Sequence, residues 1–248
     1  MRPDHRHPAS GRLRLRMALA LPLLAALLAC GCASPPARQA ATAAAPAALD
    51  PPSSPEWAND MARFAAEDAA TPPPARPVVF TGSSSVRMWD TLARDFPGVP
   101  VLNRGFGGSQ VRDATHYADQ VAVRYRPRLV VLHAGDNDIN AGRSPEQVQA
   151  DFHAFVDRIR RDLPGTRIAY LAIKPSPARI EQLPRQQQAN LLIAADAAGL
   201  VDVDFIDVAT PMLDDRGQPR AELFIEDRLH MNAAGYALWR GIVAPYLE

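Results

Sequence analysis

The sequence predicts an α/β fold in which a parallel β-sheet is covered by helices on both faces. Short apolar runs alternate along the chain with longer stretches whose apolar residues recur at helical spacing. The most continuous run, residues 129–132 (Leu-Val-Val-Leu), is typical of a strand buried on both faces at the centre of a sheet. This alternation favours parallel strands joined by right-handed crossovers.

The first elements are separated by prolines. Residues 56–70 show helical spacing after Pro55, and three prolines at 72–74 forbid a continuation of that helix. Residues 78–80 (Val-Val-Phe) are a short buried-strand run. A helix is expected over 84–96, because its large apolar residues fall on one face.

The middle of the chain repeats this pattern. Residues 101–102 predict a strand, and 110–125 have the apolar period of a helix. After the central strand, Ser144 caps the next helix, with a proline at its first position and a glutamine three residues after the serine. That helix is expected to end at Leu163, before Pro-Gly.

The last elements complete a five-stranded pattern. Strands are predicted at 168–173 and 203–206, separated by a helix over 181–198 that Gly199 stops. The closing helix spans 233–246. Asn232 is its expected N-cap, because a side-chain oxygen there can accept from free backbone N–H groups.

The N-terminus resembles an export signal over residues 1–32. Arginines precede an apolar stretch, 17–29, that is too short to span a bilayer but fits the core of a secretory signal. Leu-Leu-Ala-Cys at 27–30 resembles a bacterial lipobox, so Cys30 is the predicted lipidated residue, with Cys32 as the alternative. A plain signal peptide with two incidental cysteines is the competing interpretation. The expected location is the bacterial cell envelope, lipid-anchored at a membrane or periplasmic.

Composition divides the rest of the chain. Residues 33–55 are rich in Ala, Pro and Ser and predict an unfolded linker, which leaves 56–248 as one domain. That domain has no cysteine, which excludes an internal disulfide and a cysteine-based zinc site. Its charge is about −4 with no basic block, which argues against nucleic acid as a partner.

Four short polar segments stand out. Residues 82–85 (Gly-Ser-Ser-Ser), 103–108 (Asn-Arg-Gly-Phe-Gly-Gly) and 135–138 (Gly-Asp-Asn-Asp) each follow a predicted strand, and 227–230 (Asp-Arg-Leu-His) precedes the last helix. Because parallel strands end at a common edge where ligands bind, these segments are expected to meet. They supply the parts of a serine hydrolase.

The acid–base pair comes from Asp227 and His230. At this spacing a carboxylate can reach the imidazole nitrogen that faces away from the substrate and fix its tautomer. A surface aspartate and a helix-capping histidine are the alternative. His133 also ends a strand, but no carboxylate stands at matching spacing, so a packed structural histidine is favoured there.

Two residues are candidates for stabilising an oxyanion. Gly108 lets a backbone N–H approach closely, and Asn137 offers a neutral side-chain donor. Asn137 could equally be a turn residue like its neighbours. A phosphate-binding interpretation of the glycines fails, because neither Gly-Lys-Ser/Thr nor Gly-x-Gly-x-x-Gly is present at the first strand.

In order, these four segments resemble the sequence blocks of the SGNH (GDSL-type) hydrolase family, from about Val78 to the C-terminus. The resemblance implies a three-layer α/β/α sandwich with a five-stranded parallel, flavodoxin-like sheet. It also implies catalytic Ser84, Asp227 and His230, and an oxyanion hole of Ser84, Gly108 and Asn137. The chain departs from the family's Gly-Asp-Ser, because Ser83 takes the place of the aspartate.

Three arginines, Arg87, Arg104 and Arg179, are candidates for binding an anionic or sugar-bearing substrate, as is Lys174. Surface salt bridging is their alternative role. No metal or cofactor is expected.

The sequence therefore predicts a serine esterase, with short acyl groups favoured over long ones. The alternatives are an acyltransferase on the same triad and a catalytically inert tethered binding module. The expected partner is a small-molecule or glycan ester, with membrane contact only through the lipid anchor. Oligomeric state is not predicted.

Overall fold

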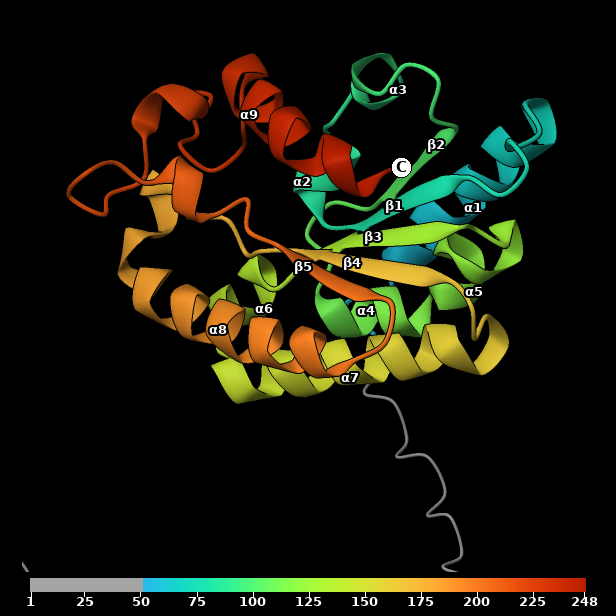
Figure 1. Cartoon of the computed structure of the whole chain (residues 1–248), viewed down its shortest axis with the longest axis horizontal. Coiled ribbons are helices and arrows are strands. Elements are labelled where there is room, and N and C mark those ends of the chain that lie inside the picture. The colour runs from blue at the N-terminus through green and yellow to red at the C-terminus, as the bar shows by residue number, and fades with distance from the viewer. Residues whose placement is uncertain (1–50) are drawn as a thin grey trace, which may run out of the picture. The chain divides into compact units, whose positions relative to one another are not determined.

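The computed structural model describes residues 51–248, which contain one five-stranded parallel sheet (Figure 1). The strands are β1 (Val78–Gly82), β2 (Val101–Gly105), β3 (Leu129–His133), β4 (Arg167–Leu171) and β5 (Val203–Ile206). Their order is β2-β1-β3-β4-β5, and every neighbouring pair is parallel. The predicted α/β fold with a flavodoxin-like sheet is confirmed.

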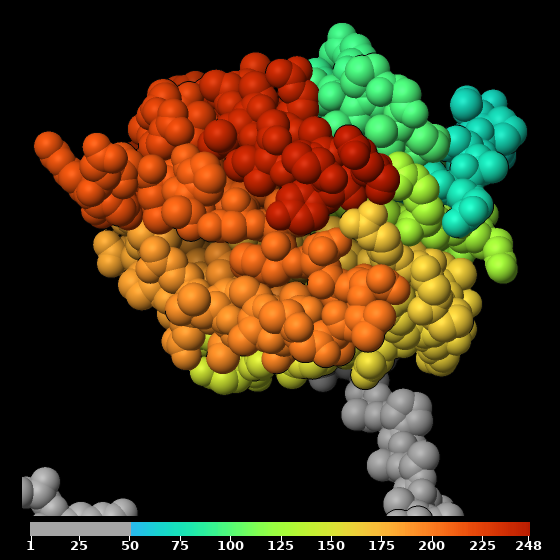
Figure 2. Space-filling view, in the orientation of Figure 1, coloured from blue at the N-terminus to red at the C-terminus, as the bar shows by residue number. Residues whose placement is uncertain are grey.

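Helices cover both faces of this sheet. One face carries α1 (Trp57–Ala70), α4 (Val111–His116), α5 (Ala118–Val121), α6 (Asp136–Asn140), α7 (Pro145–Asp162) and α8 (Leu183–Gly199). The other face carries α2 (Ser84–Arg87), α3 (Leu92–Asp95) and α9 (Ala233–Val243). Short 3-10 turns are η1 (Val123–Tyr125), η2 (Pro177–Gln182), η3 (Thr210–Met212), η4 (Ala221–Leu223) and η5 (Ala244–Tyr246). In Figure 2 the red residues of α9 lie in the upper part of the view and the orange residues of α8 in the lower part.

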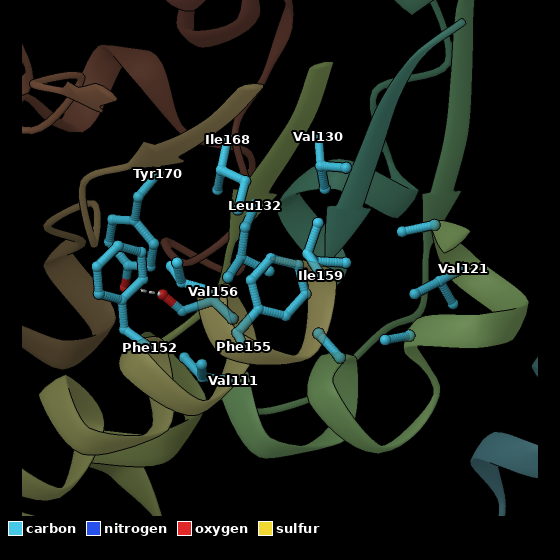
Figure 3. Packing of buried hydrophobic residues seen from close by; sticks show 14 of the residues in the cluster. Val111, Val121, Val130, Leu132, Phe152, Phe155, Val156, Ile159, Ile168 and Tyr170 are labelled. Atoms are coloured by element: carbon cyan, nitrogen blue, oxygen red, sulfur yellow. Dashed lines mark hydrogen bonds between the residues drawn. The ribbon is translucent and has the colours of Figure 1, made fainter. Parts of the chain in front are cut away.

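Two hydrophobic cores lie on opposite faces of the sheet. Alternation along β3 divides them, because Val130 and Leu132 face one core while Leu129 and Val131 face the other. Figure 3 shows the larger core, in which strand residues such as Tyr170 meet the apolar face of α7. With both faces buried, the central strands have the continuous apolar sequence that predicted them.

Two predicted helices are wrong in extent. The helix expected over 84–96 breaks after Arg87. There the Val86 carbonyl accepts from the Asn103 side chain at 2.7 Å and from the Trp89 N–H at 3.0 Å, rather than from the N–H four residues further on. The helix expected over 110–125 is interrupted at Ala122, whose φ of −142° is not helical. Both breaks depend on the tertiary fold rather than on local propensity.

Two further differences concern polar segments. Asn103–Gly105 belong to β2 rather than to the loop after it, because they pair in register with β1. Asn137 and its neighbours Asp136 and Asp138, for which the sequence also allowed a turn, lie in the short helix α6. The predicted caps are confirmed: Ser144 accepts from the Gln147 N–H, and Asn232 accepts from the first N–H groups of α9.

The strand order determines where a site can form. β2 and β3 lie on opposite sides of β1 in the sheet. The connections that leave β1 and β3 therefore run in opposite directions, and sheets of this kind have their ligand crevice at the carboxyl ends of two such strands. There Gly82 lies beside Gly105 and His133 in the register of the sheet. The segments 82–85, 103–108 and 135–138 therefore converge at one edge, as predicted.

Residues 1–50 lie outside the described part of the chain. The predicted signal over 1–32, both cysteines and most of the linker over 33–55 fall there and remain predictions. Within 51–248, Ser53 is already bound to the domain, because its N–H and its hydroxyl each donate to a carboxylate oxygen of Asp113 at 2.6 Å. None of the helices in this range combines the length and hydropathy needed to cross a bilayer.

Candidate active site

A sharp turn after β1 presents Ser84. Gly82 ends the strand with a φ of +114°, a conformation that favours glycine. The Ser83 N–H donates to the His133 carbonyl at 2.8 Å, and the Phe106 N–H donates to the Gly82 carbonyl at 2.8 Å. These bonds hold the turn between β2 and β3, so Ser84 begins α2 at the edge of the sheet.

We expect Gly82→Ala to destabilise the fold by about 3 kcal/mol or more. A Cβ there would lie 2.0 Å from the His133 carbonyl oxygen, in addition to the positive φ. Gly98→Ala is the matched control, since its φ is +85° but nothing lies within 4 Å of the added carbon. Strain alone should cost about 1–2 kcal/mol in the control. Urea unfolding of both variants measures the difference, and equal losses would contradict the predicted clash.

Only one of the three consecutive serines presents its hydroxyl to the edge of the sheet. Ser83 and Ser85 are each 3% exposed, whereas Ser84 is half-buried. The Ser84 Oγ lies 3.0 Å from Nε2 of His230. The structure thus brings together the serine and histidine that lie 146 residues apart in sequence.

A tight turn carries Asp227 and His230. One carboxylate oxygen of Asp227, Oδ1, accepts from the N–H groups of Leu229 and His230, both at 2.9 Å. The other, Oδ2, lies 2.6 Å from Nδ1 of His230. The Ile225 N–H donates to the His230 carbonyl at 2.9 Å and closes the turn, which Arg228 passes with a φ of +59°.

This geometry assigns the histidine tautomer. Because an ionised carboxylate only accepts hydrogen bonds, Nδ1 of His230 must carry the proton. Nε2 is then free to accept from the Ser84 hydroxyl. Partial burial raises the pKa of Asp227, but hydrogen bonds from the His230 side chain and from two backbone N–H groups outweigh it and hold that pKa at about 2. The carboxylate is therefore ionised at neutral pH.

Gly108 lies in the loop after β2 with a φ of +88°. A Cβ at this position would lie 3.1 Å from the indole of Trp57, so the N-terminal helix covers the loop. The Trp57 ring also packs edge-on against Phe106, and its Nε1 donates to the Ser53 hydroxyl at 3.2 Å. Sequence reasoning missed this contact, because nothing in the pattern of α1 indicates which loop it crosses.

Asn137 stands on the first turn of α6, directly after β3. Its Nδ2 donates to the Ser109 carbonyl at 3.0 Å, which ties it to the glycine loop. Its Oδ1 accepts from both terminal nitrogens of Arg179 at 3.2 Å. Within residues 51–248, the second N–H of this amide makes no hydrogen bond, and it is a candidate donor to a ligand.

The three candidate arginines lie in different surroundings. Arg87 is exposed, and its guanidinium covers Gly107 in the glycine loop. The assignment of Arg104 to substrate binding is wrong: it is 5% exposed, pairs with Asp68 of α1 and donates to the Tyr125 hydroxyl at 2.8 Å. Burial and these partners leave it no access to a ligand.

Arg179 lies beside the site but is already engaged. Besides holding Asn137, it pairs with Asp136 at 2.8 Å. Lys174 is buried, and its Nζ donates to the Leu229 carbonyl at 2.8 Å. The sequence indicates only a turn role for Asp136. Its ion-pair partners lie far along the chain, and the residues next to it do not identify them.

Two fully buried groups near this edge have shifted pKa values. Burial raises the pKa of Asp138 to about 7; its Oδ1 accepts from the Val111 N–H at 3.0 Å. Burial, reinforced by the Lys174 ammonium, lowers the pKa of His133 to about 4. His133 packs against Trp239, with ring centroids 4.8 Å apart, in agreement with the structural role that the sequence favoured.

We expect these two groups to give opposite pH dependences of stability. Folded Asp138 keeps its proton up to about pH 7, while the unfolded chain loses it near pH 4. As the pH rises from about 4 to 7, this group therefore lowers the free energy of unfolding by about 1.4 kcal/mol per pH unit. Folded His133 is neutral above about pH 4, whereas in the unfolded chain it takes a proton below about pH 6.5. As the pH rises from about 4 to 6.5, this group therefore raises the free energy of unfolding, with a slope of similar size.

Urea unfolding from pH 4.5 to 6.5 separates the two effects. Relative to wild type, Asp138→Asn should gain stability as pH rises, and His133→Leu should lose it. Parallel curves for both variants and the wild type would show that neither pKa is shifted.

A comparison with known protein families gives a match over most of the described residues. The sequence model of a family described as "GDSL-like Lipase/Acylhydrolase family" matches residues 69–238. No curated protein sequence matches the chain.

Several solved structures share the fold. A protein from Streptococcus pneumonia, provisionally described as a platelet activating factor, superposes with a TM-score of 0.69 at 23% identity, covering 78% of this chain and 93% of its own. A GDSL-like lipase from Bacteroides thetaiotaomicron gives 0.64 at 20%, covering 75% and 96%. An acetylxylan esterase from Geobacillus stearothermophilus, solved as a catalytic mutant, gives 0.58 at 14%, covering 69% and 94%. At these identities the likeness is one of fold.

Proposed function

The chain belongs to the GDSL-like lipase/acylhydrolase family, and we propose that it is a serine esterase acting on esters of short acyl groups. The observation that carries this proposal is the line of contacts from Asp227 through His230 to Ser84, with distances of 2.6 Å and 3.0 Å. Serine, imidazole and carboxylate in this order form a general-base triad.

In the proposed mechanism, the Ser84 Oγ attacks the ester carbonyl carbon while Nε2 of His230 takes the hydroxyl proton. The carbonyl oxygen becomes an oxyanion, which accepts from the N–H groups of Ser84 and Gly108 and from Nδ2 of Asn137. His230 then gives its proton to the leaving alcohol, and an acyl-serine remains. Water, deprotonated by His230, attacks this acyl group, and His230 returns the proton to the Ser84 Oγ as the acid leaves. Asp227 orients the imidazole and stabilises its cation.

Arg87 is a proposed contact for the substrate. Its exposed guanidinium lies over Gly107, next to the loop that carries Gly108, which supports a polar or anionic substituent on the substrate. The name of one similar structure, an acetylxylan esterase, makes acetylated sugars the first natural substrates to test.

The test combines a short-chain aryl ester assay with labelling by a fluorophosphonate, which reacts with an activated serine. Turnover and one label per chain, located on Ser84, would support the proposal. A protein with neither would be an inert binding module. Adding alcohol acceptors distinguishes an acyltransferase, which would form a new ester instead of free acid.

The N-terminal region carries a separate proposal, supported by the basic and apolar segments before Cys30. The chain would be exported and held at a membrane of the cell envelope by a lipid on Cys30. Recovery of the mature protein in the detergent phase would support this, and an aqueous, unlipidated mature protein would reject it.

A further inference from the structure

One short segment, between β4 and α8, reaches both halves of the candidate site. Lys174 donates to the Leu229 carbonyl at 2.8 Å, and the Ala178 N–H donates to the Arg228 carbonyl at 3.0 Å. Both carbonyls belong to the two residues that separate Asp227 from His230. The segment therefore holds the turn that carries the proposed acid and base.

The same segment holds the proposed oxyanion donor. Both terminal nitrogens of Arg179 lie 3.2 Å from Oδ1 of Asn137. Because a guanidinium only donates, this contact defines which end of the amide is oxygen. Nδ2 must then face the glycine loop, where one of its two hydrogens goes to the Ser109 carbonyl. The other hydrogen is left for an oxyanion.

Asp136 links the two cations. Its Oδ2 lies 2.8 Å from Arg179 and 3.9 Å from Lys174, and its Oδ1 accepts from Gln186 at 2.9 Å. Lys174, the single lysine of the chain, is 1% exposed. Burying an ammonium group is costly, and ion pairs in such surroundings seldom add net stability. A role in positioning the site residues would explain why these buried charges are present.

We propose that Lys174 and Arg179, joined through Asp136, are positioning residues: Lys174 fixes the Asp227–His230 turn, and Arg179 fixes the amide of Asn137. This inference rests on the proposed function. It replaces the expectation that Arg179 binds substrate, because its terminal nitrogens are engaged and its side chain is only 14% exposed.

A double-mutant cycle tests the role of Arg179. We expect Arg179→Gln to lower kcat about 10-fold with KM within twofold, and Arg179→Lys to recover part of the loss. In an Asn137→Ala background the Arg179→Gln change should have no further effect, because its target is gone. A raised KM, or an undiminished loss in that background, would identify Arg179 as a substrate contact and overturn the proposal.

Lys174→Met tests the other half, since it keeps the length of the side chain and removes the donor. We expect fluorophosphonate labelling of Ser84 to slow about 10-fold or more, and the downfield proton resonance of Nδ1–H in His230 to shift or broaden. Arg158→Met is the matched control: it removes a buried cation, paired with Asp119 and Asp162, at the opposite end of the sheet. It should lower the melting temperature but leave kcat and the resonance unchanged.

Wild-type labelling and an unshifted resonance in folded Lys174→Met would reject the positioning role. If Lys174→Met does not fold, Asp136→Asn replaces it, because it removes the carboxylate charge between the two cations. The rate of fluorophosphonate labelling and the Nδ1–H resonance of His230 are measured in the same way. A slower rate and a shifted resonance would support the positioning role, and wild-type values would reject it. The proposed function fails separately, because in that case wild-type protein would neither hydrolyse aryl esters nor take the label.

Discussion

Replacing Ser84 with alanine is expected to lower kcat for ester hydrolysis by on the order of 10⁴–10⁶, while the variant folds normally. The methyl side chain removes the only proposed nucleophilic atom, the Oγ that lies 3.0 Å from Nε2 of His230. It leaves the glycine turn and its backbone hydrogen bonds in place, so circular dichroism and melting temperature should match the wild type. Initial rates on an aryl acetate, with labelling by a fluorophosphonate, measure the loss.

The neighbouring serines provide matched controls. Ser83 precedes α2 without a side-chain capping bond, and Ser85 contributes its carbonyl, not its hydroxyl, to Tyr236 at 3.1 Å. Ser83→Ala and Ser85→Ala should therefore keep rates within severalfold of wild type and keep the label. Full activity in Ser84→Ala would falsify the assignment of the nucleophile, and loss confined to Ser83→Ala or Ser85→Ala would move it to that residue.

The fold was predictable from sequence where burial decides the residue types. The run 129–132 forms the centre of the sheet because both of its faces are covered, which requires continuous apolar residues. Helix lengths were less predictable. The break after Arg87 depends on the side chain of Asn103, which arrives from the neighbouring strand and has no signature in the sequence of the helix itself.

The same reasoning explains which site residues were found. His230 comes from the segment before α9, and its spacing from Asp227 is what indicated it. Ser84 and Asn137 stand in segments at the carboxyl ends of strands, so their convergence follows from a parallel sheet. Arg104 stands in such a segment too, yet its side chain turns toward Asp68 of α1. The direction of an arginine depends on which acidic side chains surround it, and strand alternation contains no information about partners 36 residues away.

Asp227→Asn is expected to lower kcat by about 10³–10⁴, although the side chain keeps its shape. The reason lies in the turn. Oδ1 of Asp227 accepts from the N–H groups of Leu229 and His230, so the oxygen of an asparagine must stay there to avoid opposing two donors. Its NH₂ group then faces Nδ1 of His230 and demands an acceptor. The ring proton moves to Nε2, which can no longer take the proton of Ser84.

The pH profile and a neighbouring carboxylate make this prediction specific. Since hydrogen bonds hold the pKa of Asp227 at about 2, the wild-type carboxylate stays ionised across any practical assay range. The wild type therefore keeps the acceptor that Asp227→Asn lacks, and the ratio of their kcat values should not close as the pH is lowered toward 4. Glu226→Gln removes the adjacent carboxylate, which is exposed, and should leave kcat within twofold. If Asp227→Asn keeps wild-type kcat, or if Glu226→Gln loses as much, the imidazole is oriented by another group and the proposed triad is wrong.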